Sequence, residues 1–158
     1  MKWKKQLLTL LYLFAISITA IAQSNTDSLL LELKTTSGEE KTRIYEQLIK
    51  NYKQSDADQA IIFCQALIAF ADSNGNNEGM AKGYREMGLI YERQQKQELA
   101  LEVWKKNLEL EKILKNRKNI AYSTMAIGSC LQNLARYNEA MVYFGETQKI
   151  LEEIDDLR

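Results

Sequence analysis

The chain has 158 residues, and its 21 lysines and arginines balance its 21 aspartates and glutamates, so it carries no net charge. A chain without a basic excess lacks the electrostatic field that holds nucleic acid or an anionic membrane surface, and we expect neither as a partner. It contains no histidine and no proline. The first absence excludes acid–base, metal-binding and phosphoryl-transfer chemistry at histidine, and the second leaves no residue that interrupts a helix.

Residues 1–22 have the pattern of an export signal. Three lysines among the first five residues precede an apolar run, 7–22, which closes on the small-x-small sequence of a signal peptidase site. The run is shorter than the roughly 20 residues that cross a bilayer. We therefore expect cleavage and a periplasmic protein, with an uncleaved membrane anchor facing the periplasm as the alternative. Cleavage leaves 18 basic and 21 acidic residues, a net charge of −3.

The rest of the chain has the apolar spacing of helices, and no stretch alternates with the period of a strand. Residues 23–37 are expected to form a leading helix, over 25–34, and a connector. Ser37 and Glu40 have the spacing of a capping box, and Gly75 is expected to take the left-handed conformation that ends a helix. Residues 38–158 then form one domain of three helix pairs, predicted at 38–53 and 57–72, at 78–95 and 97–115, and at 120–134 and 137–154.

A 40-residue register relates the second and third pairs, giving units at about 38–77, 78–117 and 118–157. The first unit is weaker and one residue shorter at its turn. Small residues are expected where two helix backbones approach closely, and large residues in the seam between them. The residues assigned to this repeat packing are Tyr45, Leu48, Tyr52, Ala60, Tyr84, Gly88, Tyr91, Ala100, Trp104, Gly128, Ala140 and Phe144.

This pattern resembles the tetratricopeptide repeat over about 41–155, in a variant longer than the usual 34 residues. Leu67, Asn107 and Thr147 depart from it, because alanine is usual at their places, and the usual proline is missing from every unit. The resemblance implies an all-α solenoid, a right-handed superhelix of three antiparallel helix hairpins behind the short leading helix. It also implies a function in binding a protein or peptide.

Some runs are similar to a narrower group, among them Asn119-Ile-Ala-Tyr-Ser and Tyr137-Asn-Glu-Ala. They resemble exported repeat arrays of Bacteroidetes-type bacteria, which often form the N-terminal sensory half of sensor kinases or membrane-bound regulators. The resemblance therefore implies a sensory or scaffold part of a longer signalling protein. The alternative is a standalone periplasmic scaffold without signalling output.

The first helix of each unit lines the concave face in tetratricopeptide arrays. By this resemblance the candidate peptide groove consists of Arg43, Lys50, Lys53, Lys82, Arg85, Leu89, Arg93, Tyr122, Met125, Gln132 and Asn133, and the inward-facing set is completed by Glu46, Gln54, Glu92 and Ser129. Six of these 15 residues are basic and two are acidic, so we expect a partner that carries carboxylates.

No constellation of residues indicates catalysis. Cys64 and Cys130 have no histidine to activate them, and a whole helical hairpin between them argues against a disulfide, so both are expected to be buried thiols. Paired carboxylates such as 152–153 are typical of a solvated helix face. We expect no enzyme, no metal site and no cofactor.

The predicted helix at 137–154 carries an apolar face that a following unit covers in an array. Its residues are Val142, Phe144, Ile150, Leu151 and Ile154. Three interpretations stay open: further repeats of a longer receptor, which we favour, the end-to-end pairing of two copies, or a partner that completes the surface. Membrane contact is expected only through the export signal or through a missing C-terminal part.

Overall fold

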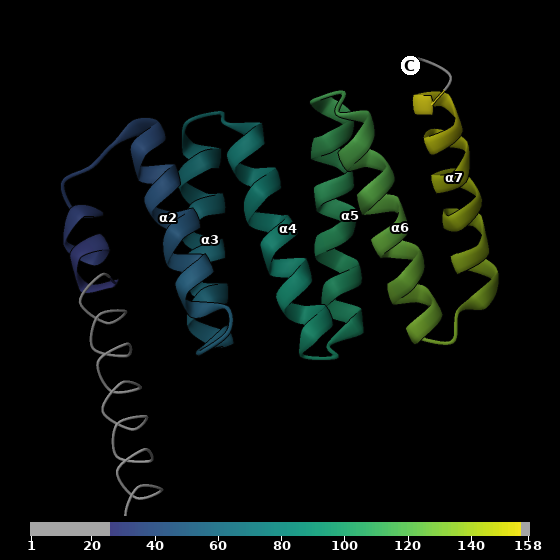
Figure 1. Cartoon of the computed structure of the whole chain (residues 1–158), viewed down its shortest axis with the longest axis horizontal. Coiled ribbons are helices and arrows are strands. Elements are labelled where there is room, and N and C mark those ends of the chain that lie inside the picture. The colour runs from purple at the N-terminus through teal and green to yellow at the C-terminus, as the bar shows by residue number, and fades with distance from the viewer. Residues whose placement is uncertain (1–25, 156–158) are drawn as a thin grey trace, which may run out of the picture.

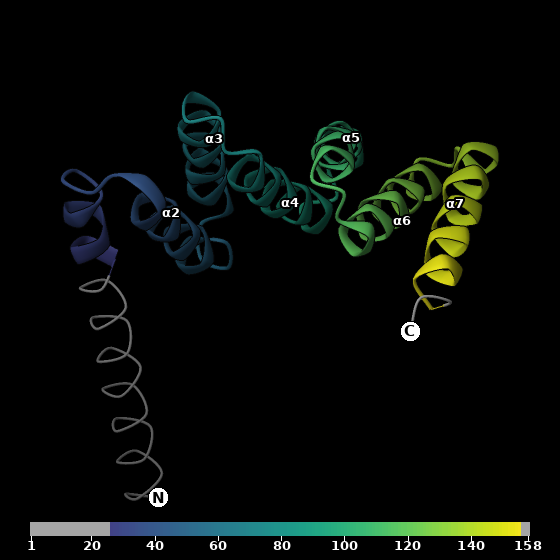
Figure 2. The same ribbon diagram turned by 90° about the horizontal axis from the view of Figure 1, so that it is seen from above.

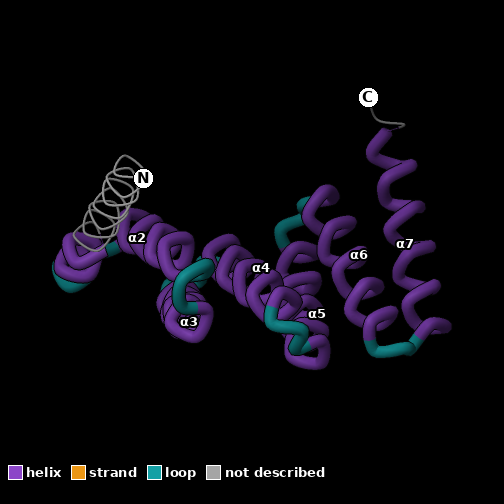
Figure 3. Tube along the Cα trace, turned by 60° about the horizontal axis from the view of Figure 1, so that its bottom comes forward, coloured by secondary structure: helices purple, strands orange, loops and turns teal. Residues whose placement is uncertain are grey.

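The computed structural model describes residues 26–155, so the predicted signal peptide lies outside the described residues. Seven helices make up this part of the chain, and it contains no strand. Consecutive helices pack against each other from one end to the other (Figure 1). Short loops connect them (Figure 3). The predicted all-α class is confirmed.

The helix bounds follow the predicted order closely. A leading helix spans residues 26–32. It is followed by α2 (Gly38–Tyr52), α3 (Ala57–Ser73), α4 (Asn77–Arg93), α5 (Gln97–Ile113), α6 (Arg117–Asn133) and α7 (Tyr137–Asp155).

Two local predictions at helix N-termini were wrong. Ser37 precedes α2, but its side chain makes no capping hydrogen bond, so the capping box does not form. The helix α6 begins at Arg117 and not at 120, because Asn116 is a cap where the sequence suggested a break. Its side-chain oxygen accepts a hydrogen bond from the backbone N–H of Asn119 at 3.3 Å, which satisfies one of the free donors of the first turn.

Four of the five connections from α2 to α7 contain the same left-handed turn. Gly75, Gln95, Lys115 and Ala135 stand 20 residues apart and have φ between +55° and +64°. In each turn the next N–H donates to the carbonyl five residues earlier, as Lys96 does to Tyr91 at 2.9 Å. The α2–α3 connection has no such residue, and its Asp56 N–H reaches back only four residues, to Tyr52. The first unit is one residue shorter than the others at its turn because it lacks this left-handed residue.

Ala135→Gly is expected to stabilise the protein by about 1 kcal/mol. Ala135 has φ +59°, in the left-handed region. There a residue with a Cβ is destabilised by roughly 1–2 kcal/mol, and glycine is not. Urea unfolding followed by circular dichroism measures the change. The same substitution at Ala69, which is exposed inside α3, is the control and is expected to destabilise by about 0.5–1 kcal/mol. Equal effects at both sites would contradict the explanation.

The small residues of the repeat lie under large rings. A Cβ built on Gly88 would meet Trp104 Cε2 at 2.7 Å, and one built on Gly128 would meet Phe144 Cε1 at 2.6 Å. Ala60, Ala100 and Ala140 are all buried. Because any larger side chain would collide with these rings, the 40-residue register corresponds to a repeated contact between the two helices of a unit.

The first helices of the units occupy one row. Seen from above, α2, α4 and α6 lie in this row, with α3 and α5 in a second one (Figure 2). Leu29 and Leu30 of the leading helix, with Leu33 directly after it, pack on the core cluster to which α2 contributes, and Thr26 accepts a hydrogen bond from Asn51 Nδ2 at 3.3 Å. All eleven candidate groove residues lie on α2, α4 and α6 or, in the case of Lys53, directly after α2.

The outer face of α7 is exposed within the described chain. Met141 is 72% exposed, whereas Leu101, its equivalent 40 residues earlier on α5, is 4% exposed. Val142 and Leu151 are exposed as well, while Phe144 and Ile150 pack partly into the core. The apolar face predicted for this helix is therefore divided between the core and solvent.

Candidate functional site

Five of the eleven predicted groove residues line one open pocket between α2 and α4. They are Arg43, Lys50, Lys53, Lys82 and Arg85, and the pocket has a volume of about 460 Å³. These basic side chains come from two helices that lie next to each other in the row (Figure 2). The structure thus brings together residues of the first and second units that are far apart in the sequence.

The pocket has an excess of positive charge. Its remaining lining residues are Glu46, Gln47, Leu67 and Glu86, so five basic residues face two acidic ones, while the whole chain has no net charge. Gln47 and Glu86 are absent from the predicted groove. They occupy equivalent places in their units, so the repeat register is the signal that could have found them.

Two of the lysines already have acidic partners. Lys53 Nζ lies 3.2 Å from Glu86 Oε2. Lys82 Nζ lies 3.2 Å from Glu46 Oε1 and 3.4 Å from Glu78 Oε1. Burial lowers the pKa of Lys82, but the hydrogen bond and charge of Glu46, together with Glu78, raise it further, so the net pKa lies above its usual value. The Lys53–Glu86 and Lys82–Glu46 pairs join the first unit to α4, and both lysines contribute to the structure of the groove.

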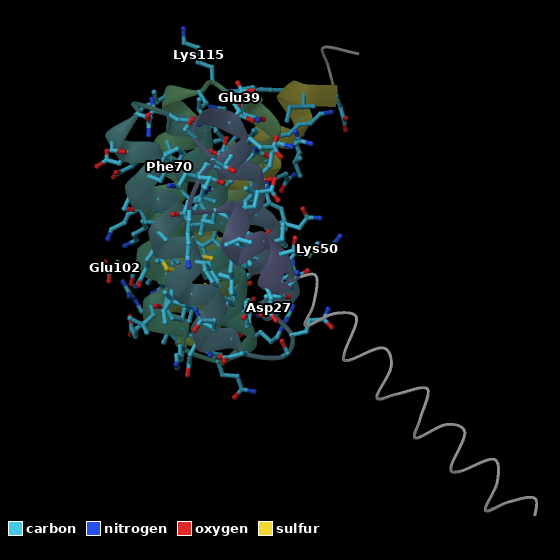
Figure 4. All side chains as sticks on the ribbon, turned by 90° about the vertical axis from the view of Figure 1, so that its left-hand side faces the viewer. Asp27, Glu39, Lys50, Phe70, Glu102 and Lys115 are labelled. Carbon is cyan, nitrogen blue, oxygen red and sulfur yellow. The ribbon has the colours of Figure 1, made fainter. Side chains whose placement is uncertain are left out.

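Lys50 and Arg85 form no ion pair within residues 26–155. Lys50 is exposed and points away from the molecule, on the side opposite to Glu102 of α5 (Figure 4). Arg85 is half-buried and also lines a second pocket, of about 300 Å³, between α4, α5 and α6. These two cations are the ones available to an anionic ligand.

The two remaining predicted arginines make structural contacts. Arg43 pairs with Glu40 at 2.7 Å within α2, and such an exposed pair is worth about 0–1 kcal/mol. The Arg93 guanidinium donates a hydrogen bond to the backbone carbonyl of Lys53 at 3.0 Å and so connects the ends of α4 and α2. We therefore assign Arg93 to the contact between units.

The other predicted groove residues lie farther along the row. Leu89 packs partly against the core cluster formed by α5, α6 and α7. Tyr122 and Met125 are exposed on α6. Gln132 and Asn133 lie exposed at the C-terminal end of the same helix. None of these residues lines the basic pocket, so the predicted groove consists of a charged part and a largely uncharged part.

A buried polar network behind the row was not predicted. Asn107 is 1% exposed, and its Nδ2 donates to the Ala81 carbonyl of α4 at 2.7 Å. Its Oδ1 lies 2.6 Å from the Oγ of Ser123 on α6. One side chain of α5 therefore connects the second unit to the third. Asn107 is also one of the departures from the repeat pattern, and that departure was the available signal.

Glu111 of α5 is a buried carboxylate in the second pocket. It is 3% exposed, and its Oε1 accepts from Asn119 Nδ2 at 3.0 Å. Its Oε2 is buried without a hydrogen-bond partner in the described chain. Burial raises the pKa of Glu111 and the charge of Glu78 acts in the same direction, while the Asn119 hydrogen bond and the charge of Arg85 lower it. The net pKa is above the usual value.

Glu111→Gln is expected to stabilise the protein at neutral pH. The folded pKa of Glu111 exceeds the unfolded one, so burying its charge opposes folding above the folded pKa, and protonation removes this cost as the pH falls. Glutamine keeps the oxygen that accepts from Asn119 and carries no charge. Urea unfolding measures the effect. The variant should have the higher free energy of unfolding at pH 7, and this difference should be smaller at pH 4. A variant that is less stable at pH 7 would instead show that Arg85 stabilises the carboxylate.

The described residues contain no group of three or more Cys, Asp or Glu side chains that could hold a metal ion. Cys64 and Cys130 are free and buried. Burial raises the pKa of each thiol to about 12, with a further contribution from Glu86 at Cys64 and from Glu92 at Cys130. Both thiols therefore stay protonated at neutral pH, and protonated thiols are poor nucleophiles.

Over residues 26–155, no helix has the length and apolarity needed to cross a membrane. A scan of the sequence against models of known protein families gives no match, and a search of curated proteins gives no significant match.

Proposed function

We propose that this protein is a non-catalytic tetratricopeptide-type repeat module that binds an extended protein or peptide segment along the row formed by α2, α4 and α6. The single observation that carries the proposal is the basic pocket between α2 and α4, whose net positive charge contrasts with a neutral chain. An open pocket between two helices can accept an extended chain, and its basic side chains can bind the carboxylates of that chain.

The repeated packing supports the proposed solenoid. Gly88 under Trp104 and Gly128 under Phe144 are equivalent contacts 40 residues apart. The main contacts of each helix are with its neighbours in the chain, and helices packed in this way form a stack that can be extended unit by unit and presents a long continuous surface. A right-handed superhelix with the first helices on its inner side is the arrangement that we propose.

The export pattern of residues 1–22 supports a location in the periplasm. There the module would serve as the N-terminal sensory or scaffold part of a longer signalling protein, and a standalone scaffold is the second candidate. The reading frame beyond residue 158 distinguishes the two. A membrane-spanning segment followed by a kinase or DNA-binding domain would support the first candidate, and an immediate stop codon the second.

Lys50→Glu combined with Arg85→Glu is expected to weaken the binding of an acidic peptide by at least about tenfold, because two favourable charge contacts become repulsive. Isothermal titration calorimetry with a peptide of alternating Glu and Ser residues measures the effect. Lys82 is a poorer choice, since it holds two glutamates in place.

Lys105→Glu is the matched control. Lys105 is exposed on α5, whose Glu102 points to the side opposite to Lys50 (Figure 4), and it lines neither pocket. One such reversal should leave binding nearly unchanged. Equal weakening by the control and by the pocket variant, or an unchanged affinity in the pocket variant, would contradict the proposed site.

A further inference from the structure

The row of first helices changes its chemistry from α2 to α6. At equivalent places of the three units stand Arg43 and Glu46, then Lys82 and Arg85, and finally Tyr122 and Met125. Tyr122 is 40% and Met125 44% exposed, although most of the side chains around them on α6 are buried. We call Leu89, Tyr122 and Met125 the apolar patch.

The apolar patch adjoins the basic pocket across α4. The Tyr122 ring contacts the edge of the buried Trp104 ring, with centroids 5.6 Å apart. Burial raises the pKa of the Tyr122 hydroxyl, the charges of Glu92 and Glu86 raise it further, and that of Arg85 lowers it. The Trp104 ring beside Tyr122 donates from its Nε1 to Glu92 Oε1 of α4 at 2.9 Å, so Tyr122 lies near this helix. Arg85 lines the basic pocket and also lines the second pocket together with Asn119 of α6, so it lies close to both sites.

The separation of the two sites corresponds to about one helix spacing. The pocket lies between α2 and α4, and the patch is formed by α4 and α6. Neighbouring packed helices are about 8–10 Å apart, and an extended chain advances about 3.3 Å per residue. A ligand that crosses α4 in an extended conformation therefore moves from one site to the other in about three residues.

We infer that the ligand is an extended peptide in which an acidic residue and a large apolar residue are about three positions apart. Its carboxylate lies between Lys50 and Arg85, and its apolar side chain lies on Tyr122 and Met125. This inference rests on the proposed peptide-binding function and adds the requirement for a second, apolar anchor at a fixed distance. The positive pocket supplies the charge complementarity that favours such a peptide over an uncharged one.

The test uses the full chain and nine-residue peptides of Gly, Ser and Asn that carry one Glu and one Leu at separations from one to six residues. Fluorescence anisotropy of labelled peptides measures their affinity. We expect a maximum near a separation of three, with affinity at least about tenfold above that of the peptide without Leu. Met125→Ser should remove this gain and leave the affinity of the Glu-only peptide unchanged.

Two further variants make the test sharper. Tyr122→Ser should have the same effect as Met125→Ser, provided that circular dichroism shows a folded protein. Met125→Ser is the more informative variant, because Met125, unlike Tyr122, contributes no ring to the contact with Trp104. Met141→Ser on α7, where the side chain is 72% exposed, is the matched control and should change nothing.

The contradicting outcomes separate the two proposals. If affinity is independent of the separation but still depends on Lys50 and Arg85, the two-anchor inference is wrong and the proposed function stands. If no acidic peptide binds, both are wrong. If vesicles of anionic lipid bind to the apolar patch and peptides do not, the inferred class of ligand is wrong.

Discussion

Asn107→Ala is expected to lower the free energy of unfolding by about 2–4 kcal/mol. The substitution removes the hydrogen bonds that connect Asn107 to the Ala81 carbonyl and to Ser123. A buried polar group that loses its partner costs about 1–3 kcal/mol, in addition to the lost bond and the cavity. Because these contacts join α4, α5 and α6, the loss should affect the junction between the second and third units.

Urea unfolding of the variant, followed by circular dichroism, measures this effect. Asn133→Ala is the matched control, since Asn133 is exposed on α6, and it should change stability by less than about 0.5 kcal/mol. In a double-mutant cycle, Ser123→Ala added to Asn107→Ala should cost less than it does alone, because the partner of Ser123 is already gone. A loss below about 0.5 kcal/mol for Asn107→Ala would show that the network does not stabilise the fold.

Gly88→Ala is expected to destabilise the protein by about 1–3 kcal/mol, although alanine is the better helix former by about 1 kcal/mol. The added Cβ would lie 2.7 Å from Trp104 Cε2. The ring has no room to move, because it is fully buried and its Nε1 donates to Glu92 Oε1 at 2.9 Å. Gly128→Ala should cost less, since Phe144 is only half-buried and can shift.

Gly145→Ala is the matched control, and it is expected to change the free energy of unfolding in the opposite direction. Gly145 is exposed in α7, and a Cβ built there meets nothing within 4 Å. The substitution should therefore stabilise by about 0.5–1 kcal/mol through helix propensity alone. Thermal and urea unfolding of the three variants check the order. Stabilisation by Gly88→Ala would refute the close contact on which the repeat register depends.

Helix existence and order were predictable because they depend on local spacing. Apolar periodicity located all seven helices to within a few residues. The N-terminus of α6 was misplaced because Asn116 is equally suited to a loop and to a cap. Ser37 shows the reverse error, since a suitable sequence formed no capping bond. In both cases the backbone geometry at the start of the helix determines whether the side chain caps it, and the sequence does not reveal this geometry.

The candidate site was only partly predictable. The tetratricopeptide resemblance named the first helices as the groove, and five of its residues, Arg43, Lys50, Lys53, Lys82 and Arg85, line one pocket in the structure. It could not show that Glu46 and Glu86 hold Lys82 and Lys53 and leave Lys50 and Arg85 unpaired. Ion pairing between helices depends on side-chain reach in three dimensions, and no sequence spacing encodes it.

The helical class, the 40-residue register and the burial of its small residues could all be read from one chain, because each follows from periodicity and side-chain size. These small residues are Ala60, Gly88, Ala100, Gly128 and Ala140. The tertiary structure decided how charges and polar groups pair between units: Asn107 bridges three helices, Glu111 is buried with one free oxygen, and Arg85 stays available. The two kinds of contact differ in the distance that they require. Apolar burial follows from which face of a helix a residue occupies, whereas a hydrogen bond or ion pair requires two atoms within about 3 Å, and only the packing of the helices sets that separation.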